Sequence, residues 1–324
     1  MLRFLINSAY SIGVDINDDN LSMAQLQNTE TGVAVLAGRS KSRPDSLEMD
    51  SVAWQKWAME VIREATENHR FNGKSVIAAV PSGEVFIEHV KMEAPFPKGS
   101  GNQEQMIKIN DGKMRQMVLS MIKQRLPFDP NDAMIQYIPT EHNNVLIMAT
   151  ERKIIDRHLA IYEKAGLTVK SIGAWPMALI NCYTTFFGRR KADLQAVVML
   201  LDIGTNYTNL VICRYKRLLF ACSILMGTKQ LDDEKIVARL VFELNACRSR
   251  FISMYPDVQI ERLIFLCSPA VDAAICKTIA GQMGIQAQMG DCLAAVEISD
   301  PLRAGIDRRN CSVNWATAFG LSMS

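Results

Sequence analysis

The feature that most constrains the fold of this chain is an internal repeat. An apolar strand ends at an aspartate, a tight turn follows, and two more strands lead into a helix and a further apolar strand. This order occurs once around Asp15 and again around Asp202. A supersecondary unit that occurs twice at so wide a spacing predicts two α/β halves of the same topology, each with its own sheet.

The two copies agree element by element. The first copy predicts strands at residues 12–16, 21–27 and 33–38, a helix at 51–69 and a strand at 75–80. The second copy predicts strands at residues 197–202, 208–215 and 218–224, a helix at 228–255 and a strand at 262–267. We therefore expect residues 1–80 and 168–195 to form the first half, and residues 196–324 to form the second.

Residues 81–167 interrupt the first half and predict a small subdomain of order β-α-β-β-α. Its expected elements are a strand at 84–92, a helix at 103–125, strands at 133–139 and 144–149, and a helix at 151–165. A linker at 98–102 precedes the first helix, Pro127 follows that helix, and Gly166 follows the second. The insertion is long enough to pack as a unit of its own.

Composition excludes several classes of function. A net charge of +2 over 324 residues leaves no basic surface for nucleic acid. No apolar stretch reaches the ~20 residues that span a bilayer, so we expect membrane contact only through partners. The eight cysteines form no C-x-x-C pair and several lie in apolar runs, which predicts reduced, buried thiols in a cytoplasmic protein.

The turn after the second aspartate carries the residues best suited to chemistry. In the run Asp202-Ile203-Gly204-Thr205-Asn206-Tyr207-Thr208, the glycine permits a turn with positive φ, and backbone N–H groups of such a turn can converge on a phosphate. The hydroxyls of Thr205 and Thr208 add donors, and Asp202 can hold Mg²⁺ through water. An ordinary hairpin turn has the same residue types, so the duplicated context favours the phosphate interpretation.

Several phrases resemble known families. The run at residues 202–208 resembles the second phosphate loop of the actin, Hsp70 and sugar-kinase superfamily. Further phrases, in order along nearly the whole chain, resemble the PilM family of type IV pilus assembly proteins; they lie at residues 80–87, 124–130, 146–150, 165–167 and 314–321. The insertion is placed as in that family and in the cell-division protein FtsA. The type II secretion protein GspL shares the architecture but leads into a transmembrane segment, which is not seen here.

The resemblance implies a duplicated actin-like (ASKHA, ribonuclease H-like) fold with an inserted FtsA/PilM-type subdomain. It implies a cytoplasmic scaffold, peripheral to the inner membrane, that binds the N-terminal cytoplasmic tail of a PilN-like membrane protein in the pilus assembly platform. It also implies ATP and Mg²⁺ as ligands, with Asp15 and Asp202 on the metal. The expected nucleotide residues are Asp15, Asn17, Asp202, Gly204, Thr205, Asn206, Thr208, Glu243 and Ser268.

The chain departs from the family pattern at two nucleotide loops. In the first loop Asn17 replaces a glycine, Ser22 replaces a lysine, and Asp18 and Asp19 add negative charge where phosphates would lie. Asparagine tolerates positive φ, so the turn itself can survive. In the purine loop Pro269 removes an N–H group. These departures predict that ATP binding is weak or lost.

Alternatives remain open at several of these positions. Ser268 and Pro269 also fit the N-cap and first residue of a helix, and Glu243 with Arg248 fits a solvated helix face. For the whole chain, an active ATPase or sugar kinase and a filament-forming actin-like protein compete with the scaffold.

Overall fold

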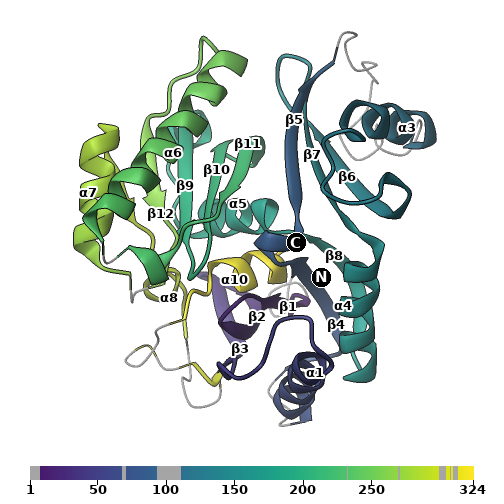
Figure 1. The fold of residues 1–324 in the computed structure, drawn as a ribbon. Helices are drawn as coiled ribbons and strands as arrows, with labels where there is room; N and C mark the ends of the chain where they lie inside the picture. The colour runs from purple at the N-terminus through teal and green to yellow at the C-terminus, as the bar shows by residue number, and fades with distance from the viewer. Residues whose placement is uncertain are drawn as a thin grey trace, which may run out of the picture.

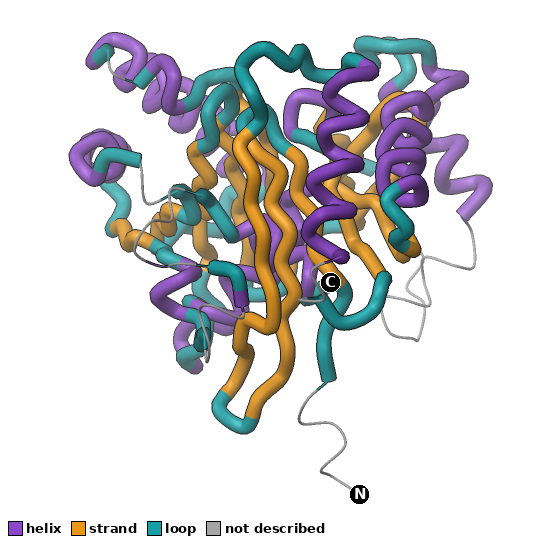
Figure 2. The backbone as a smooth tube through the Cα atoms, turned by 90° about the horizontal axis from the view of Figure 1, so that it is seen from below, coloured by secondary structure: helices purple, strands orange, loops and turns teal. Residues whose placement is uncertain are grey.

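The computed structural model describes residues 8–67, 71–92, 111–231, 233–268, 271–298, 304–306, 308 and 313–324, without the side chains of 111–113. Two five-stranded sheets have the same strand order, and a three-stranded sheet lies beside the first (Figure 1). From below, the strands lie inside with helices on both sides (Figure 2). The predicted repeat is therefore present in space, as two copies of one topology.

The first sheet has the order β3-β2-β1-β4-β8. Its strands are β1 (Ile12–Ile16), β2 (Asn20–Thr29), β3 (Gly32–Ser42), β4 (Ser75–Val80) and β8 (Thr168–Ala174). β1 pairs antiparallel with β2 and parallel with β4, and β4 pairs parallel with β8. β4 is apolar on both faces because layers cover both sides of the sheet.

The second sheet repeats this plan as β11-β10-β9-β12-β13. Its strands are β9 (Val197–Ile203), β10 (Thr208–Arg214), β11 (Arg217–Ile224), β12 (Arg262–Phe265) and β13 (Ala287–Met289). β9 pairs antiparallel with β10 and parallel with β12, as β1 does with its two neighbours. The central strands β1 and β9 therefore occupy equivalent positions, and each carries its aspartate near its end.

Each sheet has a pair of helices on its outer face. α1 (Val52–Glu67) packs with α4 (Arg152–Lys164), and α6 (Glu234–Met254) packs with α7 (Ala273–Met283). α4 was expected within the insertion, but its Ile161 and Tyr162 share a buried core with Trp54 of α1. α4 thus packs as the counterpart of α7, and we propose that the insertion ends at residue 151.

The insertion has its own sheet and core. β5 (Phe86–Lys91) and β6 (Ala133–Pro139) both pair antiparallel with β7 (Asn144–Glu151). α3 (Asp111–Ile122) covers this sheet, with Val118 and Ile122 buried against Val145 and Ile147. The predicted linker at 98–102 and the start of the helix predicted at 103–125 lie outside the described residues. The domain boundaries remain our proposal.

Two helices cross between the halves. α5 (Trp175–Phe186) follows the first sheet but also contacts β10 and β11, whereas α10 (Ala316–Ser322) ends the second half and packs on β1, β2 and β4 (Figure 1). Glycine permits their close approach: a Cβ on Gly320 would lie 1.8 Å from the carbonyl oxygen of Ala178. The exchange of helices ties the two halves into one body.

Several element ends differ from the predictions for local reasons. The helix predicted at 228–255 begins only at Glu234, because Asp233 caps it by accepting from the N–H of Lys235. α7 begins at Ala273 with Asp272 as its N-cap, so Ser268 does not cap that helix. Pro269 lies outside the described residues. The short helix α8 (Cys292–Ala295) follows β13.

Candidate functional site

A cavity of about 300 Å³ lies between the two halves, where the aspartate-led turns meet. Seven of the nine predicted nucleotide residues line it: Asp15, Asn17, Asp202, Gly204, Thr205, Asn206 and Ser268. The duplicated topology explains this, because β1 and β9 are equivalent central strands whose ends point to the same crevice. The structure therefore brings together residues that are far apart in the sequence.

Two predicted residues do not reach the cavity. Thr208 is fully buried at the start of β10, and its hydroxyl donates to the carbonyl oxygen of Met226 at 2.8 Å. Glu243 lies on α6, half-buried, and is not among the cavity-lining residues. Nearby Arg248 donates to the carbonyl oxygen of Met283 at 2.9 Å. On this helix, packing and capping account for the residues better than a ligand does.

Two carboxyl groups line the cavity side by side in the fold: Asp15 is partly buried and Asp202 is buried. Burial raises the pKa of Asp15 to about 7, the charge of Asp202 adds to this rise, and the Asn17 amide opposes it. Burial likewise raises the pKa of Asp202 to about 6, against the hydrogen bonds that its carboxylate accepts from Asn209 at 3.0 Å and Asn314 at 2.7 Å. Both groups resist ionisation because little positive charge lies near them.

This donor set fits Mg²⁺. Two carboxylates offer hard oxygen ligands, and Mg²⁺ usually takes one or two of them while keeping several waters. A bound cation would oppose the burial that raises both pKa values, and would favour the ionised carboxylates. Within the described part of the chain no cluster of three or more His, Cys, Asp or Glu side chains could hold a metal.

The first turn is held by side chains rather than by an unusual backbone. The Asn17 Oδ1 accepts from the N–H groups of Asp19 and Asn20, each at 3.0 Å. Asn17 does not have a positive φ, so this turn does not use the left-handed conformation that asparagine tolerates. Ser22, where the family pattern has lysine, is buried and its hydroxyl bonds to Asn20 at 2.9 Å. No cation takes the place of that lysine in the lining of the cavity.

The second turn is held by close backbone packing. The N–H of Gly204 donates to the carbonyl of Tyr207 at 2.9 Å, and the carbonyl of Gly204 accepts from the N–H of Thr228 at 2.9 Å. Gly204 does not have a positive φ either, so the turn does not use the conformation that this glycine permits; a Cβ there would lie 3.3 Å from the Tyr207 carbonyl oxygen. Because the N–H group of Gly204 already donates a hydrogen bond within the turn, it is not available to a phosphate.

The charged side chains in the described lining of the cavity are all acidic. Four aspartates line it and no lysine, arginine or histidine does; the aspartates are Asp15, Asp18, Asp19 and Asp202. Asp18 accepts from the Asn206 amide at 2.6 Å, which joins the two turns across the cavity. Lys229 lies 4.0 Å from Asp19 but is largely exposed. An anionic ligand alone would meet like charge here.

Sequence reasoning missed several residues of the site. Asn209 and Asn314 hold the Asp202 carboxylate, and Tyr207 lines the cavity from the second turn. An asparagine inside the apolar strand β10 was a signal for Asn209, since strands disfavour it. Nothing local marked Asn314, which comes from the opposite end of the half.

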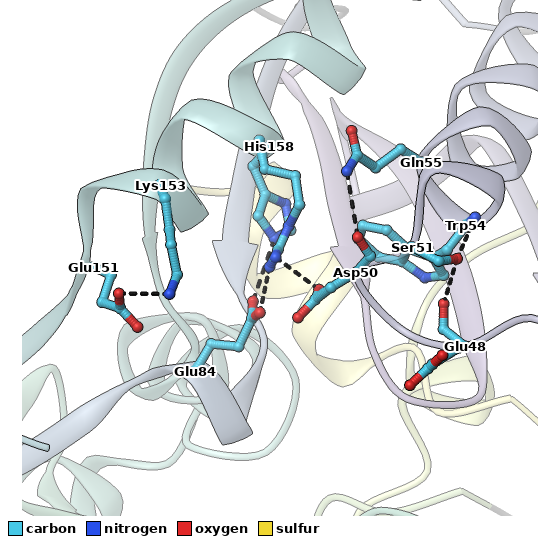
Figure 3. Close-up of polar contacts among 10 residues, drawn as sticks. Glu48, Asp50, Ser51, Trp54, Gln55, Glu84, Glu151, Lys153 and His158 are labelled. Atoms are coloured by element: carbon cyan, nitrogen blue, oxygen red, sulfur yellow. Dashed lines mark hydrogen bonds and ion pairs between the residues drawn. The ribbon is translucent and has the colours of Figure 1, made fainter. Parts of the chain in front are cut away.

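A buried charged cluster lies directly behind the cavity. Tyr207 of the second turn packs against Gly83 in the short helix Ser82–Glu84. A Cβ added to Gly83 would lie only 2.5 Å from the Tyr207 hydroxyl oxygen. Glu84 pairs with Arg157, which also lies 2.8 Å from Asp50, and Glu84 lies 3.7 Å from His158 (Figure 3). Burial opposes ionisation of Glu84, but the nearby His158 ring and the hydrogen bond from Arg157 lower its pKa overall. These contacts hold the start of the insertion against α4 and against the residues that precede α1.

The insertion also touches the second half. Glu88 of β5 pairs with Arg250 of α6, and Glu141 pairs with Arg214 at 2.7 Å. The ring of His89 stacks on Phe220 at 4.3 Å between centroids, and its Nε2 lies 3.0 Å from the carbonyl oxygen of Ala221. Burial lowers the pKa of His89 to about 4, so this contact is made by a neutral ring. The insertion thus bridges the two halves at the edge strand β11.

Comparison with known proteins identifies the architecture. A family model described as type IV pilus assembly protein PilM matches residues 13–250. A solved PilM–PilN type IV pilus biogenesis complex aligns with a TM-score of 0.70 and 17% identity, covering 97% of this chain and 98% of the matched chain.

Two other solved structures share the fold. The ethanolamine utilization protein EutJ from Carboxydothermus hydrogenoformans aligns with a TM-score of 0.50 and 11% identity, covering 100% and 93% of the two chains. A Bacteroides thetaiotaomicron protein of actin-like ATPase fold and unknown function aligns with a TM-score of 0.51 and 12% identity, covering 89% and 92%. The fold predicted from the two aspartate-led hairpins is confirmed as actin-like. Among the described residues, no helix is long and apolar enough to cross a bilayer.

Proposed function

We propose that this chain, which belongs to the family of the type IV pilus assembly protein PilM, is a scaffold of the inner-membrane assembly platform of a type IV pilus. The observation that carries the proposal is the match to that family together with similarity, over 97% of the chain, to a protein solved in complex with PilN. On this proposal the chain works in the cytoplasm, reaches the membrane through its partner, and binds the N-terminal cytoplasmic tail of a PilN-like membrane protein.

The proposal includes weak, metal-dependent nucleotide binding. The acidic lining supports this, because each close contact of a phosphate with Asp18 or Asp19 would cost roughly 1–4 kcal/mol at ~4 Å, depending on screening. Asp15 and Asp202 would hold Mg²⁺ through water, and the bound ion would supply positive charge for phosphate oxygens. Thr205, Asn206 and Ser268 would offer polar groups to the ligand from the second half.

The partner is tested with a peptide that covers the cytoplasmic tail of the PilN-like protein encoded in the same genome. Fluorescence anisotropy of the labelled peptide, titrated with the protein, should show saturable binding, and a scrambled peptide of the same composition should not bind. Absence of binding by the native peptide, with a protein shown to be folded by its thermal unfolding transition, would overturn the scaffold proposal.

Nucleotide binding is tested separately by calorimetric titration of ATP with Mg²⁺ and with EDTA. We expect a weak interaction that EDTA abolishes. Sub-micromolar binding with turnover would contradict it, and would leave the peptide result unaffected.

A catalytic alternative rests on Asp15. A partly buried carboxyl group with a pKa of about 7 in a cavity has the properties of a general base at neutral pH. An ATPase that uses this group would release phosphate continuously with Mg²⁺ and ATP, and Asp15→Asn would lower the rate by ~10² or more. If the wild-type protein and Asp15→Asn release phosphate at the same background rate, the enzyme alternative fails.

A further inference from the structure

Six of the seven described cysteines are arranged in three close pairs. Among the seven that the structure describes, the Cys182 and Cys292 sulfurs lie 3.2 Å apart and the Cys222 and Cys247 sulfurs 3.1 Å apart. A third pair, Cys267 and Cys276, is also hydrogen-bonded. Each pair joins two different elements of the fold, so none is a consequence of sequence adjacency.

The pairs differ in their access to solvent. Cys182, Cys292, Cys267 and Cys276 are all buried. Cys222 on β11 and Cys247 on α6 are both partly exposed. Only a thiol that an oxidant can reach reacts at a useful rate, so this pair is the one that oxidants in solution meet first.

The hydrogen bond between the two thiols assigns them different roles. The two sulfurs share a hydrogen bond in which either thiol can be the donor, and this bond is the largest cause that lowers the pKa of Cys247 and raises the pKa of Cys222. The guanidinium of Arg250, one turn further along α6, favours the thiolate of both cysteines, whereas burial and the Glu243 carboxylate oppose ionisation of Cys247. Cys247 is therefore the better nucleophile of the two. Cys222 lies close enough to attack the oxidised sulfur of Cys247 and complete a disulfide.

We propose that Cys222 and Cys247 form a reversible redox site that hydroperoxides close into a disulfide. The Cys247 thiolate attacks one peroxide oxygen, the O–O bond breaks, and hydroxide leaves and takes a proton to become water. The Cys222 thiolate then attacks the sulfenic sulfur of Cys247, the S–O bond breaks, and a second water leaves. Two thiols are oxidised by two electrons in total, and one hydrogen peroxide is reduced to two waters.

The site lies beneath the contact between the second half and the insertion. Cys222 follows Ala221, whose carbonyl faces His89, and Arg250, which pairs with Glu88, lies three residues after Cys247. The disulfide would join the edge strand β11 to α6 at the surface that receives β5. Oxidation would therefore stiffen the part of the second half on which the insertion rests.

The sequence allows a direct test by peptide mapping. Trypsin places Cys222 alone in residues 218–229, Cys247 alone in residues 240–248, and Cys182 and Cys292 in two further separate peptides. The folded protein is treated with graded hydrogen peroxide, alkylated and digested without reductant. We expect the linked peptide 218–229/240–248 to appear at least ~10-fold faster than the peptide that links Cys182 to Cys292, and to disappear with dithiothreitol.

Single substitutions separate the roles. Cys222→Ser should leave a sulfenic acid on Cys247 that dimedone traps, whereas Cys247→Ser should greatly slow oxidation of Cys222; Cys182→Ser serves as the matched control and should leave the 222–247 link unchanged. Wild-type protein oxidised in 8 M urea should give mixed pairings, which shows that folding selects the pair. The proposal is overturned if the linked peptide is no more abundant than other pairings in the folded protein, or if Cys247 gives only sulfinic and sulfonic acids.

Discussion

The two aspartate-led turns occupy equivalent positions and are built differently. After β1, the turn is held by the Asn17 side chain and directs Asp18 and Asp19 to the cavity. After β9, the turn is held by backbone contacts of Gly204 and presents neutral polar residues. The same fold, repeated twice, thus carries acidic side chains at the turn after β1 and neutral polar side chains at the turn after β9.

This difference teaches that topology and ligand chemistry are separable. The strand order is the same in both halves because it depends on apolar strands and crossover helices. The charge at each turn depends on a few side chains that no core contact requires. A PilM-like fold can therefore persist while the side chains at its turns change, so the fold by itself does not decide what the turns bind.

The largest effect is expected from disrupting the close contact between α5 and α10, the two helices that hold the halves together. Gly320→Ala in α10 would place a methyl group 1.8 Å from the carbonyl oxygen of Ala178, a backbone atom that cannot move freely. We expect a loss of at least ~3 kcal/mol in the free energy of unfolding, or failure to fold. Urea denaturation measures it. Gly281→Ala in α7, where a Cβ meets nothing within 4 Å, is the matched control and should be neutral or slightly stabilising.

The next test concerns the acid at the end of β1. The pKa of Asp15 is about 7 in the folded protein against an ordinary value of 3.8, so between these values the folded state binds more protons than the unfolded state. Stability should therefore fall as pH rises from ~4 to ~7, by up to ~4 kcal/mol for this group. Asp15→Asn should remove most of this slope and raise stability at pH 8 by ~2–3 kcal/mol.

The measurement is thermal or urea unfolding between pH 5 and pH 8 in EDTA. Asp257→Asn, an exposed acid on the second half, is the control and should not change the slope. Addition of Mg²⁺ at pH 8 should stabilise the wild-type protein and have little effect on Asp15→Asn. If the slopes of wild type and Asp15→Asn are equal, the pair of Asp15 and Asp202 is not the source of the pH dependence.

A third test makes the first turn neutral like the second. Asp18→Asn with Asp19→Asn keeps the size of both side chains and an acceptor for the Asn206 amide, but removes two negative charges from the cavity. We expect the affinity for Mg-ATP to rise by ~10-fold, or about 1.4 kcal/mol. Calorimetry at fixed ionic strength measures this change in affinity. Asp257→Asn, which removes one negative charge away from the cavity, is the control. An unchanged or weaker affinity would show that charge is not what limits binding.

The smallest changes in stability are expected from substitutions in the turns themselves. They compare the turn held by a side chain with the turn held by backbone contacts. Asn17→Gly restores the glycine of the family pattern but removes the acceptor of two N–H groups, so we expect a loss of about 1 kcal/mol. Gly204→Ala adds a Cβ 3.3 Å from a carbonyl oxygen and should cost less than ~1 kcal/mol. Urea denaturation compares them. A gain in stability for Asn17→Gly would mean that the first turn does require a left-handed residue.

Much of the fold followed from local patterns. The strands at residues 75–80 and 133–139 were predicted with the bounds that the structure shows, because each is a short apolar or alternating run between turn residues. The start of α6 was placed too early, since the stretch at 228–233 contains a short 3₁₀ turn (Thr228–Gln230) and the cap Asp233 before the helix begins. Helix ends depend on such caps, which periodicity does not reveal.

The candidate site was only partly predictable. Asp15 and Asp202 were found because a strand that ends in aspartate before a tight turn is a local signal. Thr208 was also predicted for the site, but it does not line the cavity, because its hydroxyl donates to the buried carbonyl of Met226 instead. Asn314 was missed because its role depends on a contact with Asp202 across the second half.

By itself, the sequence determined the element order, the duplication, the inserted block and the two aspartates, since all of these depend on residue type and spacing along the chain. Only the tertiary structure decided that α4 packs with α1, that α5 and α10 cross between the halves, and that four aspartates share a cavity without a lining cation. It alone brought Cys222 to Cys247. The physical reason is that burial, pKa and pairing depend on neighbours in space, and those neighbours come from segments that folding brings together.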